Sequence, residues 1–438
     1  MAILTREEAK RIIDKVLSYS NCDELNVSLG GGRTGNIRYA RNTVSTAGIT
    51  DDLSLAVTAV YGKKSGSATI NEFDDESLEK TVRRAEEIAK LAPENPEFLP
   101  ALGPQQYLES QGFANATANI SAEDRAKLAI DSIQPCIDGG LTAAGYLEDS
   151  AGFSAIGNTK GLFAYNRSTS VDFSVTVRTN DGRGSGYVSK DYNDSSKLNS
   201  GAATSVAIQK AKASAEAQAI EPGKYTVILE PLAASNLLGG IVNQMNARNA
   251  DEGRSFLSKQ GGGTRLGEKL FDERVNIYSD PTHPEVPVSP WTGDGLPRKK
   301  MTWIENGVVK NMVYSRYWAE KNGVEPIPSP GAIIMEGGND SLADLIRSTE
   351  RGVLVTRFWY IRSVDPQTLL VTGLTRDGTF FIENGQIKFP VKNFRFNESP
   401  IVMLNNIEAM GRPERVGGSM IPPMKIRDFT FTSLSDAV

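Results

Sequence analysis

The segment Tyr225-Thr-Val-Ile-Leu229, followed by Glu230-Pro231, decides how the rest of the sequence can be interpreted. Its aromatic, β-branched and apolar residues predict a short buried strand. Because proline cannot donate a hydrogen bond to a neighbouring strand, we expect the strand to end before Pro231. Beyond the proline, apolar residues recur with helical spacing, namely Leu238, Ile241, Val242 and Met245. This spacing predicts a helix that buries one apolar face.

The opposite face of the predicted helix carries Gly239, Gly240, Asn243 and Gln244. Each glycine in a helix interior costs about 1 kcal/mol relative to alanine. The glycine pair therefore indicates that something approaches this face closely, or that the helix begins further along the chain. The face has no histidine, cysteine, aspartate or glutamate, so no metal site can be derived from it.

Length and composition predict a cytoplasmic protein of two domains. The chain has 438 residues, of which 39% are hydrophobic and 23% charged, and its net charge is −5. This charge argues against a nucleic-acid-binding surface. No apolar run reaches the roughly 18 residues that a membrane span needs, and the first residues lack a secretory signal pattern. Cys22 and Cys136 lie far apart, as is typical of reduced thiols.

The sequence contains one histidine, His283, within a proline-rich segment that we expect to be an extended loop. A Ser-His-Asp triad, a Cys-His pair or a multi-histidine metal site would each have to use this residue. Nothing near it in sequence completes a ligand set. We therefore assign no catalytic residue and no metal ligand from the sequence.

The first half of the chain predicts helices that alternate with strands. Thr5 with Glu8, and Ser121 with Asp124, are typical of helix-capping boxes, and Asp75 is expected to cap a further helix. The glycine-rich stretch Gly30–Gly35 follows a strand. It lacks the Gly-Lys-Ser/Thr ending of a phosphate-binding loop, so we expect a hairpin loop there.

An internal repeat indicates that this half is duplicated. Residues 54–66 align without gaps on residues 174–186, and each stretch has a strand, a glycine turn, a Ser-Gly pair and a following helix, the second over residues 202–217. Two hairpins that merely share turn chemistry are the alternative. We interpret residues 1–220 as an N-terminal α+β domain with a duplicated strand–helix unit.

Glu221-Pro-Gly223 marks the expected boundary, and residues 221–438 are predicted to form a β-rich domain with antiparallel sheets. Asn306-Gly307 and Asn384-Gly385 predict two hairpins, because Asn-Gly readily adopts the positive φ angles of a type I′ turn. A short helix is expected over residues 341–346. Strands are expected over residues 352–358 and 424–431.

Other motifs in the second half allow two interpretations each. The glycine patches Gly261–Gly263, Gly337–Gly338 and Gly417–Gly418 are either ligand-approach points or, as we favour, loops. Asp294-Gly295 either lines a cleft or forms a plain turn. The aromatic run between Arg357 and Arg362 suits either an interface or a core strand.

The carboxylates form no obvious pair. Adjacent acidic side chains cannot converge on one face of a strand or helix, so Asp251-Glu252 and Asp272-Glu273 do not support paired acid/base chemistry. The fold could still bring Asp251, Asp272 or Asp294 together. A hydrolase that uses these carboxylates therefore stays open as an alternative.

The order of several motifs resembles the TldD/TldE family, whose TldE side is also called PmbA or modulator of DNA gyrase. The resemblance covers nearly the whole chain and rests on the duplicated N-terminal unit together with five further segments. These are 225–231, Asp294-Gly295 with Ile304-Glu-Asn-Gly307, Val371-Thr-Gly373, Phe381–Pro390, and Gly417-Gly-Ser419 with Pro422-Pro423.

The resemblance implies an N-terminal α+β domain, a C-terminal β-rich domain, and a heterodimeric zinc peptidase that cleaves unstructured peptides. In TldD-like members the helix after the strand carries an HExxxH motif, and a C-terminal cysteine helps to bind the metal. These positions correspond here to Gly239, Gly240 and Gln244, with the cysteine expected near Gly418. This departure implies a TldE-like chain without cofactor, with zinc in a TldD-like partner.

Three function classes remain open at this point. The first is a TldE-like subunit of a zinc metallopeptidase, for which Asn243, Arg254 and Asp294 are candidate contacts to peptide or partner. The second is a homodimeric, non-catalytic peptide-binding protein, and the third is the carboxylate hydrolase. Whether this chain is itself an enzyme is left undecided by the sequence.

Overall fold

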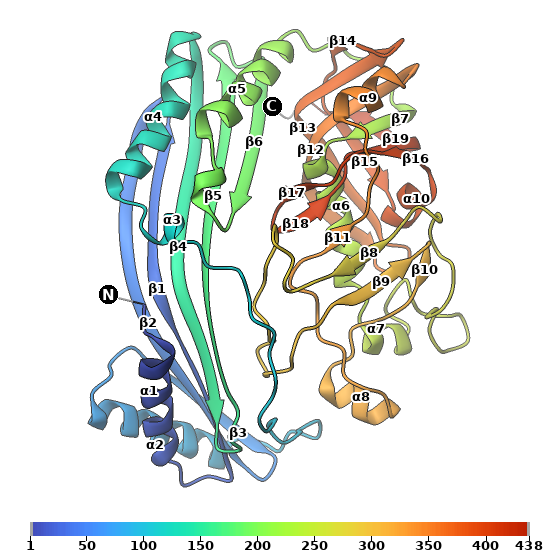
Figure 1. Ribbon diagram of the computed structural model, residues 1–438. Helices are drawn as coiled ribbons and strands as arrows, with labels where there is room; N and C mark the ends of the chain where they lie inside the picture. The colour runs from blue at the N-terminus through green and yellow to red at the C-terminus, as the bar shows by residue number, and fades with distance from the viewer. Residues whose placement is uncertain (1–2, 436–438) are drawn as a thin grey trace.

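The computed structural model describes residues 3–435 and has two parts that lie side by side (Figure 1). Strands from residues 24–192 form one six-stranded antiparallel sheet, and strands from residues 223–434 form two further sheets. The α+β prediction is confirmed. The division into domains 1–220 and 221–438 stays our prediction. No helix in residues 3–435 is long and apolar enough to cross a membrane.

The first part is built as two copies of a helix, three strands and a helix. Its sheet has the order β3-β2-β1-β4-β5-β6, so that the two copies meet at β1 and β4. The first copy comprises α1 (Arg6–Ser18), β1 (Glu24–Ala40), β2 (Thr43–Tyr61), β3 (Lys64–Ile70) and α2 (Asp75–Leu91). After α3 (Asn115–Ala118), the second comprises α4 (Ala122–Asp138), β4 (Leu141–Asn158), β5 (Phe163–Thr179), β6 (Ser185–Tyr192), the 3-10 turn η1 (Ser195–Lys197) and α5 (Ser200–Ala213).

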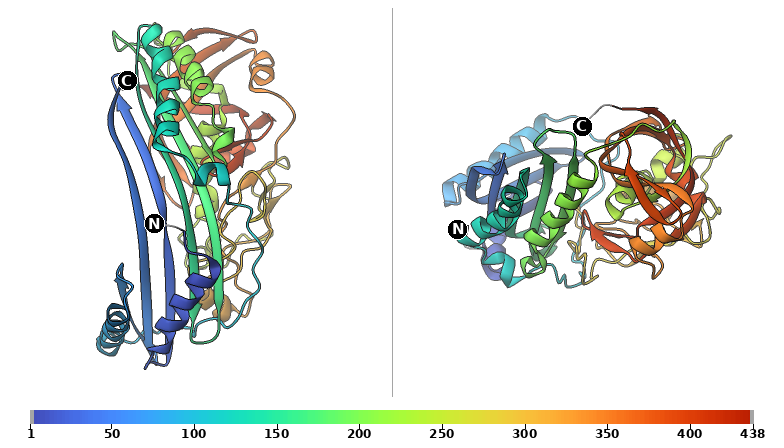
Figure 2. Two further views of the ribbon diagram at one scale, coloured as in Figure 1. Left: turned by 60° about the vertical axis from the view of Figure 1, so that its left-hand side comes forward. Right: turned by 90° about the horizontal axis from the view of Figure 1, so that it is seen from above.

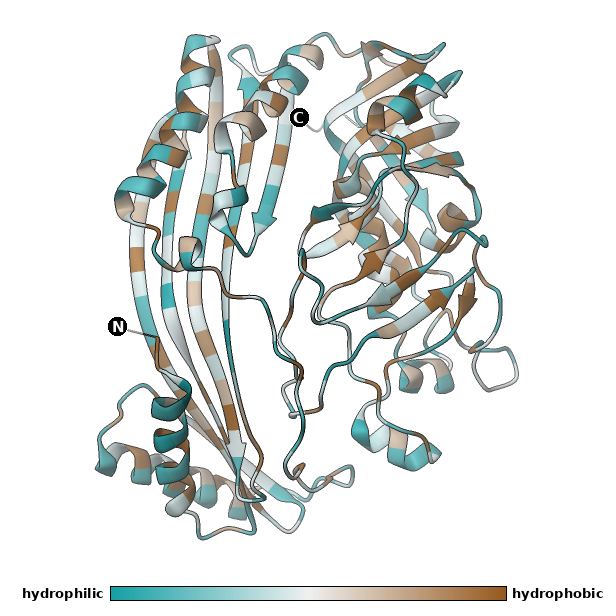
Figure 3. Cartoon of the chain, in the orientation of Figure 1, coloured by the Kyte–Doolittle hydropathy of each residue, from teal (hydrophilic) through white to brown (hydrophobic). Residues whose placement is uncertain are grey.

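All four long helices of this part cover the same face of the sheet. Buried residues alternate along β4 and β5, and brown hydrophobic bands recur along the strands of this sheet in Figure 3. In β1, for example, Leu25, Val27 and Leu29 pack against α1 and α2, whereas Ile37 and Tyr39 pack in the cluster that includes α4 and α5. The alternation follows from the two-residue period of a strand.

The duplication is visible in one pair of equivalent glycines. A Cβ atom on Gly66 would lie 2.5 Å from the carbonyl oxygen of Ala85 in α2. On Gly186 it would lie 2.1 Å from the carbonyl oxygen of Ala207 in α5. Both strands therefore use glycine where a helix backbone approaches closely, while Gly62 (φ 58°) and Gly182 (φ 75°) supply the turns.

The hairpin loop predicted at Gly30–Gly35 is wrong, because these residues lie in the middle of β1. Close packing, rather than a turn, explains two of the glycines in this stretch. A Cβ on Gly32 would lie 2.3 Å from the carbonyl oxygen of Ala151, and one on Gly35 would lie 2.2 Å from Nη1 of Arg125. The chain turns instead at Arg41–Asn42, where both φ angles are positive.

The predicted helix caps are confirmed with one shift. Thr5 with Glu8 and Ser121 with Asp124 form capping boxes. The cap of α2 is Asp74, whose carboxylate accepts a hydrogen bond from Ser77 N at 2.9 Å, whereas Asp75 is the first residue of the helix. The helix predicted over 202–217 is α5, which begins and ends a few residues earlier.

The second part has a closed ring of five strands, β12-β7-β19-β15-β13, in which β13 pairs back to β12. Figure 2 shows this ring from above. The strands are β7 (Gly223–Leu229), β12 (Arg351–Asp365), β13 (Leu370–Glu383), β15 (Phe394–Glu398) and β19 (Met424–Leu434). Two short strands, β14 (Gln386–Pro390) and β16 (Ile407–Met410), pair with β13 and β19.

A second sheet, of order β10-β9-β8-β11-β18-β17, lies beside the ring. Its strands are β8 (Ile277–Ser279), β9 (Met301–Glu305), β10 (Val308–Val309), β11 (Ile334–Met335), β17 (Glu414–Val416) and β18 (Ser419–Ile421). The helices of this part are α6 (Pro231–Asn243), α7 (Ala247–Asp251), α8 (Arg316–Asn322), α9 (Leu342–Arg347) and α10 (Pro400–Asn405). Both Asn-Gly hairpins are confirmed, with positive φ at all four residues.

Candidate functional site

The candidate site is built on α6, which follows the ring strand β7 directly. Glu230 caps the helix in an extended conformation, and Pro231 is its first residue, where its missing N–H is not needed. The predicted apolar face is confirmed: Leu238, Ile241 and Val242 are buried in the largest core cluster, as is Met245 just beyond the helix. One side of α6 is thus fixed by packing.

The glycine face of α6 is open. No heavy atom of the described residues, apart from the helix's own backbone, lies within 4 Å of a Cβ placed on Gly239 or Gly240. The helix begins at Pro231, so a later start does not explain the glycines either. The close approach that we expected is not made by residues 3–435. A side chain at either position would therefore meet open space at its Cβ atom.

The structure places the other candidate residues at different distances from this face. Asn243 is the last residue of α6 and is exposed, and Gln244 follows it as a half-buried cap. The Gln244 carbonyl accepts a hydrogen bond from the Ser255 hydroxyl at 3.0 Å, which fixes the chain after the helix. Arg254 lies nearby in sequence but is exposed, and its guanidinium pairs with Glu252.

The Gly417–Gly418 turn joins β17 to β18, and both strands lie against α6. The two strands that flank this turn therefore contact the helix that carries Gly239 and Gly240. Its two N–H groups are already used, because they donate to the Asp191 carboxylate of β6 at 2.9 and 3.0 Å. Arg415 also reaches Asp191, at 2.8 Å. The turn is an anchor between the two parts.

The donor chemistry of these four positions does not fit a zinc ion. Protein zinc sites take thiolate, imidazole or carboxylate ligands, and Gly239, Gly240 and Gly418 have no side-chain donor while Gln244 offers only an amide. Throughout residues 3–435, no three His, Cys, Asp or Glu side chains gather as a metal site would require. We derive no chemical step through a metal in this chain.

The carboxylates of the alternative hydrolase are each held by a local partner. Asp251 accepts a hydrogen bond from Trp318 Nε1 at 2.6 Å. Asp272 pairs with Arg274, which lowers the pKa of this carboxyl to about 2. Asp294 bonds to Thr292 within its own turn. Such individually held side chains are typical of structural roles.

The turn that contains Asp294 contacts the first part of the molecule. Gly295 has a φ of 79°, so the turn interpretation is confirmed. Its carbonyl accepts a hydrogen bond from the Tyr107 hydroxyl at 2.7 Å. Burial, with a smaller contribution from the nearby Asp294 charge, raises the pKa of Tyr107 to about 12. Tyr107 is therefore protonated and donates this bond at neutral pH.

The glycine patches and the aromatic run take different roles. Gly261–Gly263 face open space with positive φ, as loops do, whereas the backbones of Gly337 and Gly338 pack closely on the segment around Gly411. In the aromatic run only Phe358 is a core residue. Trp359 and Tyr360 are exposed, and Arg376 and Arg362 lie over their rings.

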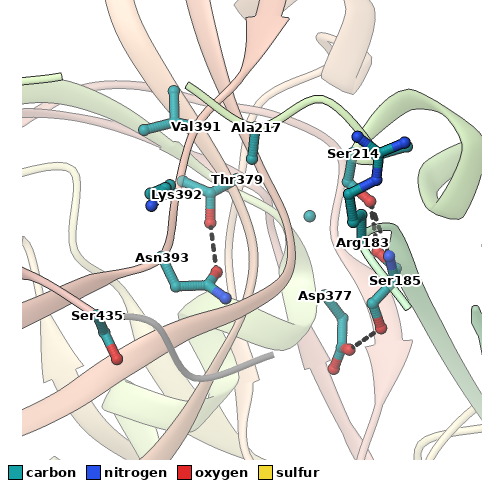
Figure 4. Close-up of a pocket in the computed structure, with 12 residues that line it drawn as sticks. Arg183, Ser185, Ser214, Ala217, Asp377, Thr379, Val391, Lys392, Asn393 and Ser435 are labelled. Atoms are coloured by element: carbon teal, nitrogen blue, oxygen red, sulfur yellow. Dashed lines mark hydrogen bonds between the residues drawn. The ribbon is translucent and has the colours of Figure 1, made fainter. Parts of the chain in front are cut away.

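A cavity of about 270 Å³ lies where β6 and the end of α5 meet β13 (Figure 4). The buried Asp377 carboxylate accepts hydrogen bonds from the Ser185 hydroxyl and, at 2.7 Å, from Nε of Arg357. Thr379 donates to Asn393 at 3.3 Å on the other side of the cavity. Sequence reasoning missed this junction, because Ser185 and Asp377 lie far apart in the chain and match no motif.

Comparison with known proteins agrees with this architecture. Models of PmbA/TldA metallopeptidase domains match residues 27–89 (domain 1), 105–218 (central domain) and 222–433 (C-terminal domain). The metalloprotease PmbA of Escherichia coli O157:H7 is 21% identical over 467 aligned positions, which cover 97% of this chain and 98% of that protein. A metalloprotease of Methanothermobacter thermautotrophicus is 26% identical, but the aligned part covers only 44% of either chain.

Two solved structures share the fold. A modulator of a DNA gyrase from Thermotoga maritima has a TM-score of 0.87 at 18% identity, over 97% of this chain and 100% of that one. TldE from Thermococcus kodakarensis has the same TM-score and identity, over 97% and 99%. With three domain models in sequence and a relative aligned along the whole length, this chain belongs to the PmbA/TldD metallopeptidase family.

Proposed function

We propose that this chain is a TldE-like, non-catalytic subunit of a cytoplasmic zinc metallopeptidase that degrades unstructured peptides. A TldD-like chain of the same family would supply both the zinc ion and the general base. The observation that carries the proposal is the open glycine face of α6, where the family resemblance places HExxxH. A zinc hydrolase needs ligands and a base for its water, and the residues present offer neither.

The proposed role of the α6 face is to form one wall of the peptide chamber. Helix glycines leave backbone exposed and side-chain space free, so an extended peptide or a partner element can lie close to the helix. The anchored turn at Gly417–Gly418 keeps β17 and β18 against α6 when such a ligand binds. Asn243, at the exposed end of α6, is placed to contact the same ligand.

The proposal is tested by reconstitution. The purified chain is assayed alone, and after mixing with an HExxxH-bearing family member, on an unstructured fluorescent peptide. We expect peptidase activity in the mixture and none in the chain alone. The matched controls are the partner alone and a partner whose HExxxH glutamate is replaced by glutamine. Peptidase activity of the isolated chain would contradict the proposal and would favour the alternative of a hydrolase that uses its own carboxylates.

A further inference from the structure

A second cavity, of about 460 Å³, lies at the outer edge of β5. Its inner wall is the first part of β5, from Phe163 to Arg167. Its outer wall is the linker over residues 105–113, which runs between the two parts of the molecule (Figure 1), together with Pro290 and Trp291. The volume is within the range typical of small-ligand sites.

The β5 wall has an unpaired backbone edge. β6 pairs with β5 only from Val171 onward. Thr169 N donates to the Gly112 carbonyl at 2.9 Å, so the backbone groups of Thr169 point away from β4. Since alternate residues of an antiparallel strand point to the same side, Tyr165 and Arg167 also direct their N–H and C=O groups outward. Within residues 3–435 no hydrogen bond reaches these outward groups.

Aromatic rings line the cavity on both walls. Tyr165 is fixed, because its hydroxyl donates to the Leu4 carbonyl at 2.6 Å and its ring stacks on Phe153. On the outer wall the Tyr107 ring lies 5.3 Å from that of Trp291, centre to centre. Rings that are already held in place can contact an apolar side chain of a ligand at little cost in conformational entropy.

The charged residues of the lining favour an anion. They are Arg6, Arg167 and Glu109, so that two positive charges oppose one negative charge. Arg167 lies 4.3 Å from the ring centre of Phe113, and Arg6 lies 5.1 Å from that of Phe163. Neither guanidinium forms an ion pair or a hydrogen bond with another residue of the described chain. A guanidinium without such a partner can bind a ligand carboxylate through two hydrogen bonds.

One end of the unpaired edge is closed. Beyond Arg167, the N–H of Thr169 is taken by Gly112, and the Thr169 carbonyl accepts a hydrogen bond from Asn193 Nδ2 at 2.8 Å. A ligand backbone that pairs with Tyr165 and Arg167 therefore has to end beside Arg167. A peptide ends either in an ammonium or in a carboxylate, and the positive charge of Arg167 attracts only the carboxylate.

We propose that this cavity binds the free C-terminal end of a peptide as an added strand beside β5. The terminal carboxylate binds Arg167, the peptide backbone pairs with Tyr165, and an apolar side chain lies against Tyr107 and Trp291. The added strand gives affinity through main-chain hydrogen bonds, and capture of the carboxylate gives specificity. The proposal builds on the peptidase role proposed above, since a peptidase takes up and releases such ends, but the site lies on other elements than α6 and needs no partner chain.

The experiment measures fluorescence anisotropy with the isolated full chain and a pentapeptide that is labelled at its N-terminus and ends in alanine and leucine. We expect saturable binding, with a dissociation constant at least about tenfold higher for the same peptide with a C-terminal amide. Arg167→Gln should weaken binding of the free acid as strongly and leave binding of the amide unchanged. Arg84→Gln, which alters an exposed arginine of α2, is the matched control and should change neither constant. Far-UV circular dichroism should be unchanged in both variants, because both side chains are exposed.

A second probe tests the backbone pairing without altering the protein. The last two peptide bonds of the ligand are N-methylated in turn. Because only alternate residues face the edge, one of the two methylated peptides should bind about fivefold more weakly than the other.

Three results would overturn the proposal: no binding of the free acid, equal binding of acid and amide, or binding that Arg167→Gln does not weaken, since the peptide would then lie elsewhere. No partner chain is present in this experiment, so its outcome is separate from that of the reconstitution. Peptidase activity in the mixture without peptide binding at Arg167 would overturn this proposal alone.

Discussion

Two pairs of glycines in this molecule serve opposite purposes. Gly66 and Gly186 occupy equivalent strands of the repeat, and a Cβ on either would lie within 2.3 Å of a helix backbone atom. Gly239 and Gly240 lie next to each other on α6, and no atom of the described residues beyond their own helix backbone comes within 4 Å of their Cβ positions.

The difference in surroundings separates glycines that the packing of the fold requires from glycines that it does not require. The close packing of α2 and α5 explains Gly66 and Gly186 completely, since any side chain there would displace a helix. Contacts among residues 3–435 do not explain the α6 pair, which lowers helix stability by about 1 kcal/mol per glycine. In the function proposed above, the open face is used by the peptide or partner that binds there.

The largest expected effect comes from filling the open face with metal ligands. We expect the variant Gly239→His, Gly240→Glu, Gln244→His with Ser419→Cys to bind one zinc ion with at least micromolar affinity, a gain of about 8 kcal/mol of binding free energy. The Cβ atoms of the new residues at 239 and 240 would meet no heavy atom within 4 Å beyond their chain neighbours and the helix backbone. Calorimetric titration with zinc measures the affinity.

The matched control for this variant carries Gln244→Ala in place of Gln244→His, and should lose most of the affinity. If the complete variant folds but binds no zinc, the α6 face and the 417–419 turn are not arranged as a metal site, and the correspondence of positions fails.

The next largest effect is expected at Gly186. Gly186→Ala places a methyl group 2.1 Å from the carbonyl oxygen of Ala207 and 2.7 Å from Ala211 N. α5 must shift, and we expect the free energy of unfolding to fall by about 3 kcal/mol. Urea unfolding measures the change, with Ser189→Ala on the same strand as a control of small effect. If Gly186→Ala changed the free energy of unfolding no more than the control does, α5 would be able to shift at little energetic cost.

Gly66→Ala should cost less, about 2 kcal/mol. Its methyl group would lie 2.3 Å from Ala89 N of α2. α2 can move more readily than α5, because α5 also contacts β13 of the second part. The same urea experiment tests the order of the two effects, and a reversed order would contradict the idea that contact with β13 holds α5 in place.

The smallest effect has the opposite sign. Gly239→Ala and Gly240→Ala should each raise the free energy of unfolding, by up to about 1 kcal/mol, because alanine restricts the unfolded chain and meets no atom in the folded one. Thermal unfolding detects the shift, and Asn243→Ala serves as a control on the same face. Destabilisation by either alanine would remove the contrast between the two glycine pairs.

Local signals in the sequence predicted local structure well. The capping boxes at Thr5 and Ser121 and the hairpins at Asn306 and Asn384 are formed as expected, because each depends on residues within one turn of the chain. The repeat was also detectable, since its glycine turns recur at fixed spacing.

Long-range contacts could not be predicted in the same way. Gly30–Gly35 was assigned to a loop because a glycine run is compatible with both a turn and a crowded strand, and only the neighbours Ala151 and Arg125 decide between them. The Asp377 junction and the anchoring of the Gly417–Gly418 turn by Asp191 join distant segments. No spacing rule in the sequence relates such partners.

The most direct test of the account is the zinc content of the isolated wild-type chain. After dialysis against zinc and then against buffer, metal per chain is measured by mass spectrometry, with the rebuilt α6 variant as the positive control. The account predicts no stoichiometric zinc in the wild type. One tightly held zinc ion per wild-type chain would contradict it, since the ligands would then lie somewhere other than α6.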